Sequence, residues 1–152
     1  RTNIYCDNTA IRIQDICRVN SNTIGIPSYL NIFLTNSGTY SIKRLTMSRE
    51  TTFSPLQSCN YFNIDDNVIQ GGPNAIPGSK LDLKLSMTAP FTDSSGNVLD
   101  CSEIDTTNFL PDNQQVTMLE ITPWINIDGV DIHCTNSRIT IKDINMLNKL
   151  CS

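Results

Sequence analysis

His133 is the only histidine in the chain, and a cysteine, Cys134, follows it directly. Both fall in a predicted β-strand, where successive side chains point to opposite faces, so they cannot work as a cysteine–histidine nucleophile pair. A serine–histidine–acid arrangement would also need His133, and the chain has no G-x-S-x-G motif. Acidic residues that could serve glycoside hydrolysis all fall in predicted turns or loops: Asp65, Asp66, Glu103, Asp105, Asp128 and Asp131. We therefore expect a solvent-facing His133 and no enzyme.

Two acidic stretches carry the hard oxygen ligands that calcium prefers. One is Asp65-Asp66-Asn67, and the other runs from Asp93 to Asn97. Neither has the twelve-residue spacing of an EF-hand loop, and ordinary turns have the same composition. We expect no cofactor, with calcium as the alternative.

Trp124 is the single tryptophan, and it could bind a ligand together with other aromatic residues. With Tyr40, Phe53 and Tyr61 it could form a flat platform for a sugar. The alternative for a tryptophan between Pro123 and Ile125 is a core position between two sheets. The binding candidates from loops and aromatic residues are therefore Tyr61, Asp65, Asp66, Asn67 and Trp124.

Six cysteines are spread along the whole chain: Cys6, Cys17, Cys59, Cys101, Cys134 and Cys151. They form no CxxC pair and there is only one histidine, so a zinc cluster is not expected. An even number of isolated cysteines favours three disulfides and an oxidising compartment. Their pairing stays open among 15 connectivities. We expect Cys151 to hold the C-terminus in place.

The formal net charge is -4, and the 11 basic residues are scattered. Nucleic acid is therefore not an expected partner, because there is no basic stripe to neutralise phosphates. No apolar run approaches the length of a membrane-spanning helix, so membrane insertion is not expected either. None of the 17 asparagines begins an N-x-Ser/Thr sequon. Chance explains this absence, and the alternatives are a bacterial, archaeal or viral source or a surface kept bare for packing against partners.

The chain holds 19 Ile, 16 Thr and 17 Asn but only 3 Ala, which favours sheet and turns over helix. Alternating apolar residues predict a hairpin over residues 29–48, turning at Asn36-Ser37-Gly38, where Gly38 could take a positive φ, with a bulge at Lys43-Arg44. Further strands are predicted at 4–6, 10–13, 59–64 and 81–87. Asp128-Gly129 predicts a tight type I′ hairpin. Pro123 is expected at a bend or a sheet edge, and residues 49–57 in a connection.

These patterns predict one all-β domain over residues 1–152, a two-sheet antiparallel β-sandwich of jelly-roll or immunoglobulin-like type, stapled by disulfides, with about nine to eleven short strands. Residues 1–19 are expected as an edge strand or an N-terminal arm. Residues 31–48 are similar in rhythm to carbohydrate-binding β-sandwich modules but lack the aligned surface aromatics of those modules, so they assign no family.

Three functions remain open from the sequence. The first is a non-catalytic, secreted or cell-surface recognition or adhesion module that binds a protein or glycan through loops 49–57, 65–79 and 102–115. The second is a structural subunit that binds copies of itself in a fibre, coat or wall layer by strand addition. The third is a small secreted enzyme or toxin, for which no catalytic set is found.

Overall fold

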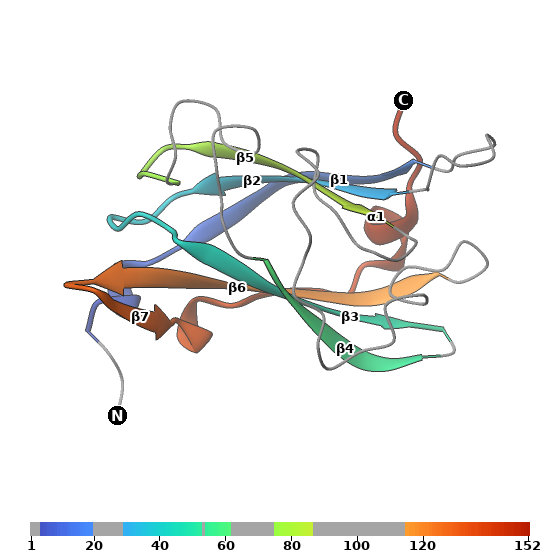
Figure 1. Ribbon diagram of the computed structural model, residues 1–152. Helices are drawn as coiled ribbons and strands as arrows, with labels where there is room; N and C mark the ends of the chain where they lie inside the picture. Colours follow the sequence, from blue (N-terminus) through green and yellow to red (C-terminus); the bar gives the residue numbers. More distant parts are fainter. Residues whose placement is uncertain (1–3, 20–28, 53, 62–74, 87–114) are drawn as a thin grey trace.

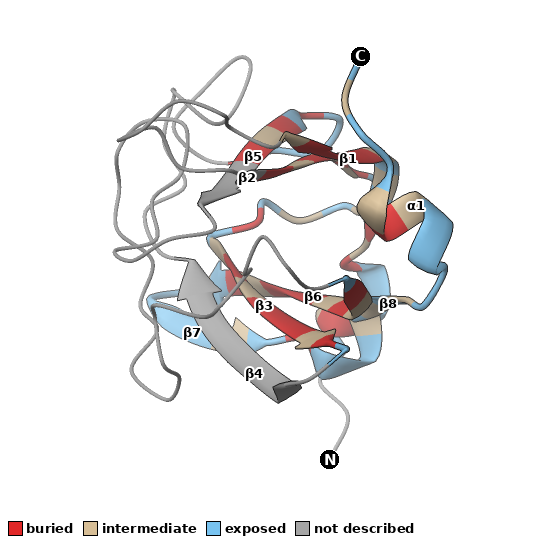
Figure 2. Cartoon of the chain, turned by 90° about the vertical axis from the view of Figure 1, so that its right-hand side faces the viewer, coloured by how far each residue is buried: buried red, intermediate tan, exposed pale blue. Residues whose placement is uncertain are grey.

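The computed structural model describes residues 4–19, 29–52, 54–61, 75–86 and 115–152; for residues 29, 54–61 and 84–86 it describes the backbone alone. The described chain is almost entirely β-sheet, arranged as two antiparallel sheets in two layers (Figure 1). Buried residues lie on the strands of both layers (Figure 2). The all-β, two-sheet prediction is confirmed. Eight strands lie in the described part, and the predicted total for the whole chain stays a prediction.

The smaller sheet has three strands in the order β1-β2-β5. They are β1 (Ile11–Val19), β2 (Tyr29–Asn36) and β5 (Lys80–Ser86). Leu30, Ile32 and Leu34 of β2 alternate into the core at 1%, 0% and 1% exposure. The predicted strands at 10–13 and 81–87 correspond to β1 and β5. The predicted strand at residues 4–6 is wrong, because the chain there forms a turn and the short 3-10 helix η1 (Cys6–Asn8).

The larger sheet has five strands, in the order β4-β3-β6-β7 with β8 also pairing β6. Their bounds, with those of the short helices that follow, are β3 (Arg44–Thr51), β4 (Ser54–Tyr61), β6 (Val116–Ile127), β7 (Val130–His133), β8 (Ile139–Ile141), η3 (Thr135–Ser137) and α1 (Ile144–Asn148). Asp143 caps α1 by accepting hydrogen bonds from the backbone N–H groups of Asn145 (3.0 Å) and Met146 (3.2 Å). The helix contacts both β6 and β1, so it joins the two layers at one end.

The predicted hairpin over residues 29–48 is wrong. Its two halves, β2 and β3, lie in different sheets: β2 pairs with β1 and β5, whereas β3 pairs with β4 and β6. The change of parity that predicted a bulge at Lys43-Arg44 marks a crossover between the layers. Asn36 fixes the start of this crossover, because its fully buried amide donates to the carbonyls of Tyr40 (2.8 Å) and Ala75 (2.6 Å) and accepts from Gly38 (3.0 Å).

Gly38 is needed for a reason that the sequence does not reveal. Its φ is not positive, so the chain does not use the left-handed conformation that a glycine allows here. A Cβ at this position would instead lie 2.5 Å from the backbone N of Ala10 and 2.7 Å from the carbonyl O of Asn8. The glycine therefore lets the crossover pack directly against the N-terminal segment, whose Asn8 carbonyl accepts from Thr39 N at 2.8 Å.

Residues 49–57, predicted to be a connection, instead form the end of β3 and the start of β4, with Thr51 paired to Ser54. One of the polar residues in this segment, Arg49, is fully buried. It lies on the core-facing side of β3, alongside Leu45 and Met47. Burial lowers the pKa of Arg49 to about 10, so its guanidinium remains protonated at neutral pH. Pro55 fits because β4 is an edge strand of its sheet.

The Asp128-Gly129 hairpin is confirmed. Ile127 pairs with Val130 across it, and both turn residues have positive φ, 52° and 83°, as a type I′ turn requires. Pro123, expected at a bend or edge, lies inside the central strand β6. It is tolerated there because β6 pairs with β8 up to Ile121 and with β7 from Trp124, so the missing N–H falls between the two partners.

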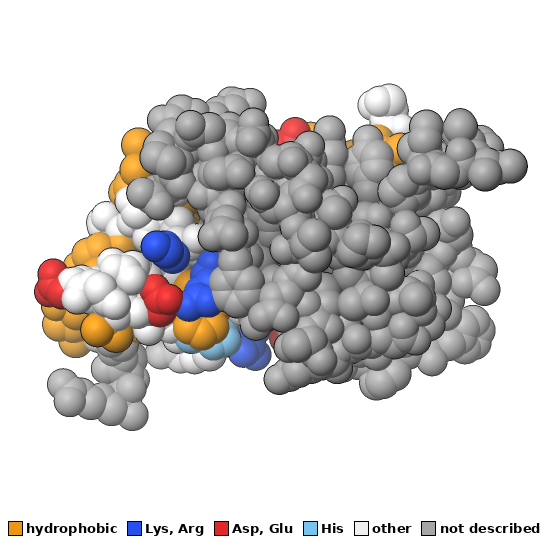
Figure 3. Space-filling view, in the orientation of Figure 1, with side chains coloured by type: hydrophobic (Ala, Val, Ile, Leu, Met, Phe, Trp, Pro, Cys, Tyr) orange, Lys and Arg blue, Asp and Glu red, His pale blue; other side chains and the backbone are white. Residues whose placement is uncertain are grey.

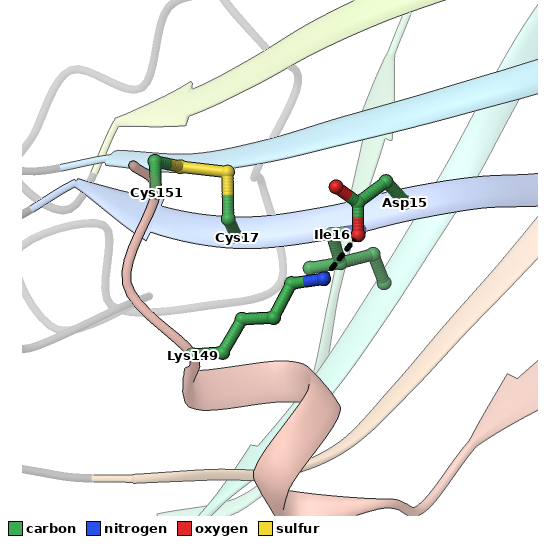
Figure 4. The surroundings of a disulfide bond; sticks show 5 residues. All are labelled: Asp15, Ile16, Cys17, Lys149 and Cys151. Carbon is green, nitrogen blue, oxygen red and sulfur yellow. Dashed lines mark hydrogen bonds and ion pairs between the residues drawn. A yellow bond between two sulfur atoms is a disulfide. The ribbon is translucent and has the colours of Figure 1, made fainter.

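Two disulfides attach the chain ends to different sheets. Cys6 is bonded to Cys134 after β7, and Cys17 of β1 is bonded to Cys151. The C-terminal segment runs beside β1 (Figure 4), where Arg18 N donates to the carbonyl of Lys149 at 2.7 Å and Cys151 N donates to the carbonyl of Arg18 at 3.0 Å. The prediction that Cys151 holds the C-terminus is confirmed. The side chains of Cys59 and Cys101 lie outside the described residues.

Within the described ranges, no helix has the length and apolar character that crossing a membrane requires.

Candidate functional site

Trp124 lies on the outer face of the five-stranded sheet and is not a core residue. Its neighbour Ile125 is fully buried, while Trp124 itself is half-buried, as the alternation of a strand requires. Its indole N–H donates to Thr46 Oγ1 at 2.7 Å, across the β3–β6 pair. The sequence left a binding role and a core role open for this tryptophan, and the structure places it on the surface.

Three side chains from three neighbouring strands form a stack centred on Trp124. The strand register aligns Arg44 of β3, Trp124 of β6 and His133 of β7 in one row. The imidazole of His133 lies parallel to the indole, with ring centroids 4.1 Å apart and planes 8° apart. The Arg44 guanidinium lies 4.4 Å from the indole centroid in a cation–π contact. Both the imidazole and the guanidinium thus lie against the indole ring.

Asp131 holds the cationic end of this stack. It forms an ion pair with Arg44 and accepts a hydrogen bond from the Asn126 amide at 2.8 Å. That hydrogen bond, together with the positive charges of Arg44 and Lys43, lowers the pKa of Asp131, so the carboxylate stays ionised at neutral pH. The Asn126 oxygen in turn accepts from Gly129 N at 3.1 Å, which ties the cluster to the β6–β7 turn.

His133 is held neutral in this arrangement. Partial burial against the indole lowers its pKa from the ordinary value of 6.5, and the positive charges of Arg138 and Arg44 lower it further. Its neighbour Cys134 is fully buried and disulfide-bonded, so it offers no thiol. The predicted outward orientation of His133 is confirmed.

A shallow hollow of about 230 Å³ adjoins the stack. It is lined by Ser41, Ile42, Lys43 and Asn126. Lys43 is exposed and takes part in no ion pair among the described residues. Arg44 and Arg138 form ion pairs with Asp131 and Glu120, and Lys43 is a further positive charge beside the hollow. Figure 3 shows basic side chains, a hydrophobic group and the histidine adjoining at this end of the molecule.

Most of the remaining predicted site residues lie outside the described part of the chain. Tyr61 lies on the edge strand β4 and pairs with Leu45, and its side chain is outside the described part. Asp65, Asp66, Asn67, Asp93 and Asn97 fall outside the described residues, as do Phe53 and most of the predicted binding loops 65–79 and 102–115. Tyr40 packs edge-on against Tyr5, with ring centroids 5.6 Å apart. In the described ranges, no group of His, Cys, Asp or Glu could hold a metal ion.

Sequence reasoning singled out Trp124 and His133 but did not bring them together with Arg44, Lys43 or Asn126. The Asp-Gly turn fixes the pairing of β6 with β7, so the Trp124–His133 contact was within reach of a register argument. Nothing local in the sequence aligns Arg44 with Trp124, because that pair depends on the long-range β3–β6 pairing.

The comparisons with known proteins give no relative. No family model matches the chain, and no curated protein or solved structure shows significant similarity to it.

Proposed function

We propose that this chain is a non-catalytic recognition module of an extracellular or cell-surface protein, and that it binds a protein partner through the surface around Trp124. The observation that carries the proposal is the ordered Arg44–Trp124–His133 stack on an outer sheet face, beside a hollow lined by Lys43. Tryptophan and arginine dominate the binding energy of protein interfaces. Their side chains are already held in place here, so binding would cost little side-chain entropy.

The same geometry favours a protein over a sugar at this surface. A sugar ring stacks on a free aromatic face, and here His133 and Arg44 already lie against the indole ring. The surface offers the edge of the stack, a shallow hollow and the exposed positive charge of Lys43. A partner that inserts an acidic side chain beside Lys43 would match this arrangement.

The extracellular placement is supported by the two disulfides, because disulfides persist in oxidising compartments. A self-assembling subunit is the alternative. Strand addition by the N-terminal segment receives less support, since the Cys6–Cys134 disulfide and the Asn8–Thr39 hydrogen bond hold that segment on its own domain.

The proposal is tested by charge reversal at Lys43, with Lys142 as the matched control. Both are exposed lysines in loops next to strands of the five-stranded sheet, Lys43 before β3 and Lys142 after β8. Fluorescently labelled wild-type, Lys43→Glu and Lys142→Glu proteins are titrated onto intact cells of the producing organism, before and after the cells are treated with protease. Saturable, protease-sensitive binding that Lys43→Glu weakens by about tenfold or more and Lys142→Glu leaves unchanged is expected.

Trp124→Phe serves as a second variant, because it keeps an aromatic ring at the centre of the stack while losing part of the surface and the N–H bond to Thr46. It should also weaken binding while the melting temperature shows a folded domain. Equal binding by all four proteins, or binding that survives protease treatment of the cells, would refute a protein partner at this surface.

A further inference from the structure

The outer face of the smaller sheet carries a second hollow, on the layer opposite the Trp124 surface. It has a volume of about 380 Å³ and is lined by Gln14, Asp15, Phe33, Lys80 and Asp82 together with the strand residues Leu34 and Leu81. This volume lies within the range of about 300–1,000 Å³ typical of small-molecule sites. All of its lining residues come from β1, β2 and β5, so a rigid sheet positions them.

Phe33 is the central feature of this hollow. It lies on the solvent side of β2, since Ile32 and Leu34 on either side point into the core. The strand register places Asp15 of β1 on one side of Phe33 and Asp82 of β5 on the other. Among the described aromatic side chains, none stacks on Phe33. Phe33 therefore places a phenyl ring at the centre of a polar sheet face.

A β-bulge brings two consecutive polar side chains to the hollow. The register between β1 and β2 shifts between Ile13 and Asp15, which leaves Gln14 as the extra residue. Strict alternation would point Gln14 and Asp15 to opposite faces, yet both line the hollow. Bulges commonly re-aim side chains near binding sites.

The two carboxylates are held in position by the protein. Asp15 accepts from Lys149 Nζ at 2.5 Å and from Ile16 N at 2.9 Å (Figure 4). Both bonds go to Oδ1, so Oδ2 has no donor within the described part of the chain. The Asn31 amide, oriented so that its nitrogen donates, reaches Asp82 Oδ1 at 2.6 Å. The C-terminal segment that carries Lys149 is itself fixed by the Cys17–Cys151 disulfide.

Charges of both signs surround the hollow. Asp15 forms an ion pair with Lys149, and Lys80 and Asp82 both line the hollow. The Arg12 guanidinium lies 3.0–3.2 Å from the side-chain oxygen of Gln14, once that amide is oriented to accept. This mixture of charges selects neither a cation nor an anion, and the site offers an aromatic surface with several hydrogen-bond donors and acceptors. A neutral ligand with one apolar face and many hydroxyl groups matches both properties.

We propose that the hollow over Phe33 is a carbohydrate-binding site, in which a neutral sugar ring stacks on Phe33 and its hydroxyl groups bond to Asp82, Gln14 and Asp15. This site is independent of the protein-binding surface around Trp124, because the two lie on different sheets. The domain would thus hold a glycan on one layer and a protein on the other.

The test is a titration of the 15N-labelled protein with neutral trisaccharides of glucose in α1,4 and β1,4 linkage, of xylose and of mannose, followed by two-dimensional NMR. At least one trisaccharide should shift the backbone amide signals of Gln14, Asp15, Phe33 and Asp82. Phe33→Ala should weaken that binding by about tenfold, as expected for a lost stacking contact. Phe33→Tyr should keep it, because the ring remains.

Lys43→Glu is the control at the other surface and should bind the trisaccharide like the wild type, so the two proposals fail separately. The carbohydrate site is overturned if none of the trisaccharides shifts these amides, or if Phe33→Ala binds as tightly as Phe33→Tyr in a folded protein. It is also overturned if trilysine or triglutamate shifts the same amides more strongly than any of the sugars.

Discussion

Removing either terminal disulfide should lower the free energy of unfolding by less than its sequence separation suggests. Removing both should lower it by more than twice the loss for one. The two disulfides span 128 and 134 residues. In the loop-closure account, an isolated crosslink of that length stabilises the fold by about 5 kcal/mol through the entropy of the unfolded chain. However, each disulfide shortens the loop that the other one closes.

The length of this shortened loop sets the stability lost when one disulfide is removed. When the Cys6–Cys134 disulfide is intact, a shorter path already connects Cys17 to Cys151. It runs eleven residues back from position 17 to position 6, across the disulfide, and seventeen residues on from position 134 to position 151, which makes 28 residues. Closing a loop of that length is worth about 3.6 kcal/mol. The same route applies when Cys17–Cys151 remains and Cys6–Cys134 is removed. Each single removal should therefore cost about 3.6 kcal/mol, and the double removal about 8.5 kcal/mol.

The assay is urea unfolding at equilibrium, followed by the fluorescence of Trp124, the only tryptophan. The three proteins compared with the wild type are Cys6→Ala/Cys134→Ala, Cys17→Ala/Cys151→Ala and the variant that carries all four changes. A loss of 8.5 kcal/mol would consume most of the stability of an ordinary domain, so the fourfold variant should be unfolded or nearly so without urea. Strictly additive costs of about 5 kcal/mol each would refute the shared route. A cost below about 1 kcal/mol for either pair would refute its role as a crosslink of the unfolded chain.

Three further predictions follow from single contacts. Gly38→Ala should destabilise the domain by about 1–3 kcal/mol, because the new Cβ meets the backbone of Ala10 and Asn8, whereas Ser37→Ala beside it should be nearly neutral in the same urea assay. Asp143→Ala should cost about 1 kcal/mol by removing the cap of α1, and Asp143→Asn should recover most of it. The pKa of His133 is lower in the folded state than in the unfolded state, so stability should fall as the pH drops below about 6.5 and level off below the folded pKa. Thermal melts across that range should show this step, and His133→Tyr, which keeps a ring but does not titrate there, should lose it; an unchanged step in the variant would assign it to other groups.

The parts of the fold that depend on neighbouring residues could be predicted from the sequence. The Asp128-Gly129 turn needs two positive φ values that this pair adopts readily, and its strands pair directly across it. The strand at 81–87 was clear because Leu81 and Leu83 alternate with charged residues. The paired state of Cys151 also followed from its position near the chain end.

Long-range pairing decided the features that the sequence did not reveal. A change of parity near Lys43 is equally compatible with a bulge within one strand and with a crossover between sheets, and only the pairing of β2 and β3 with other strands separates the two. Residues 49–57 were predicted to be a connection partly because they include the charged Arg49, and the sequence does not distinguish a buried charge from a solvated one. The candidate site also depends on long-range pairing. The sequence singles out Trp124, but the stack with Arg44 forms between two residues that are 80 positions apart.

The most direct test of the recognition surface is site-specific photo-crosslinking. A benzoylphenylalanine is placed at position 41, in the hollow beside Lys43, and, as a control, at position 142. Each protein is bound to cells of the producing organism and irradiated. We expect a covalent adduct with a protein of another sequence from position 41 and none from position 142. Equal adducts from both positions, or an adduct only with a second copy of the chain, would contradict it.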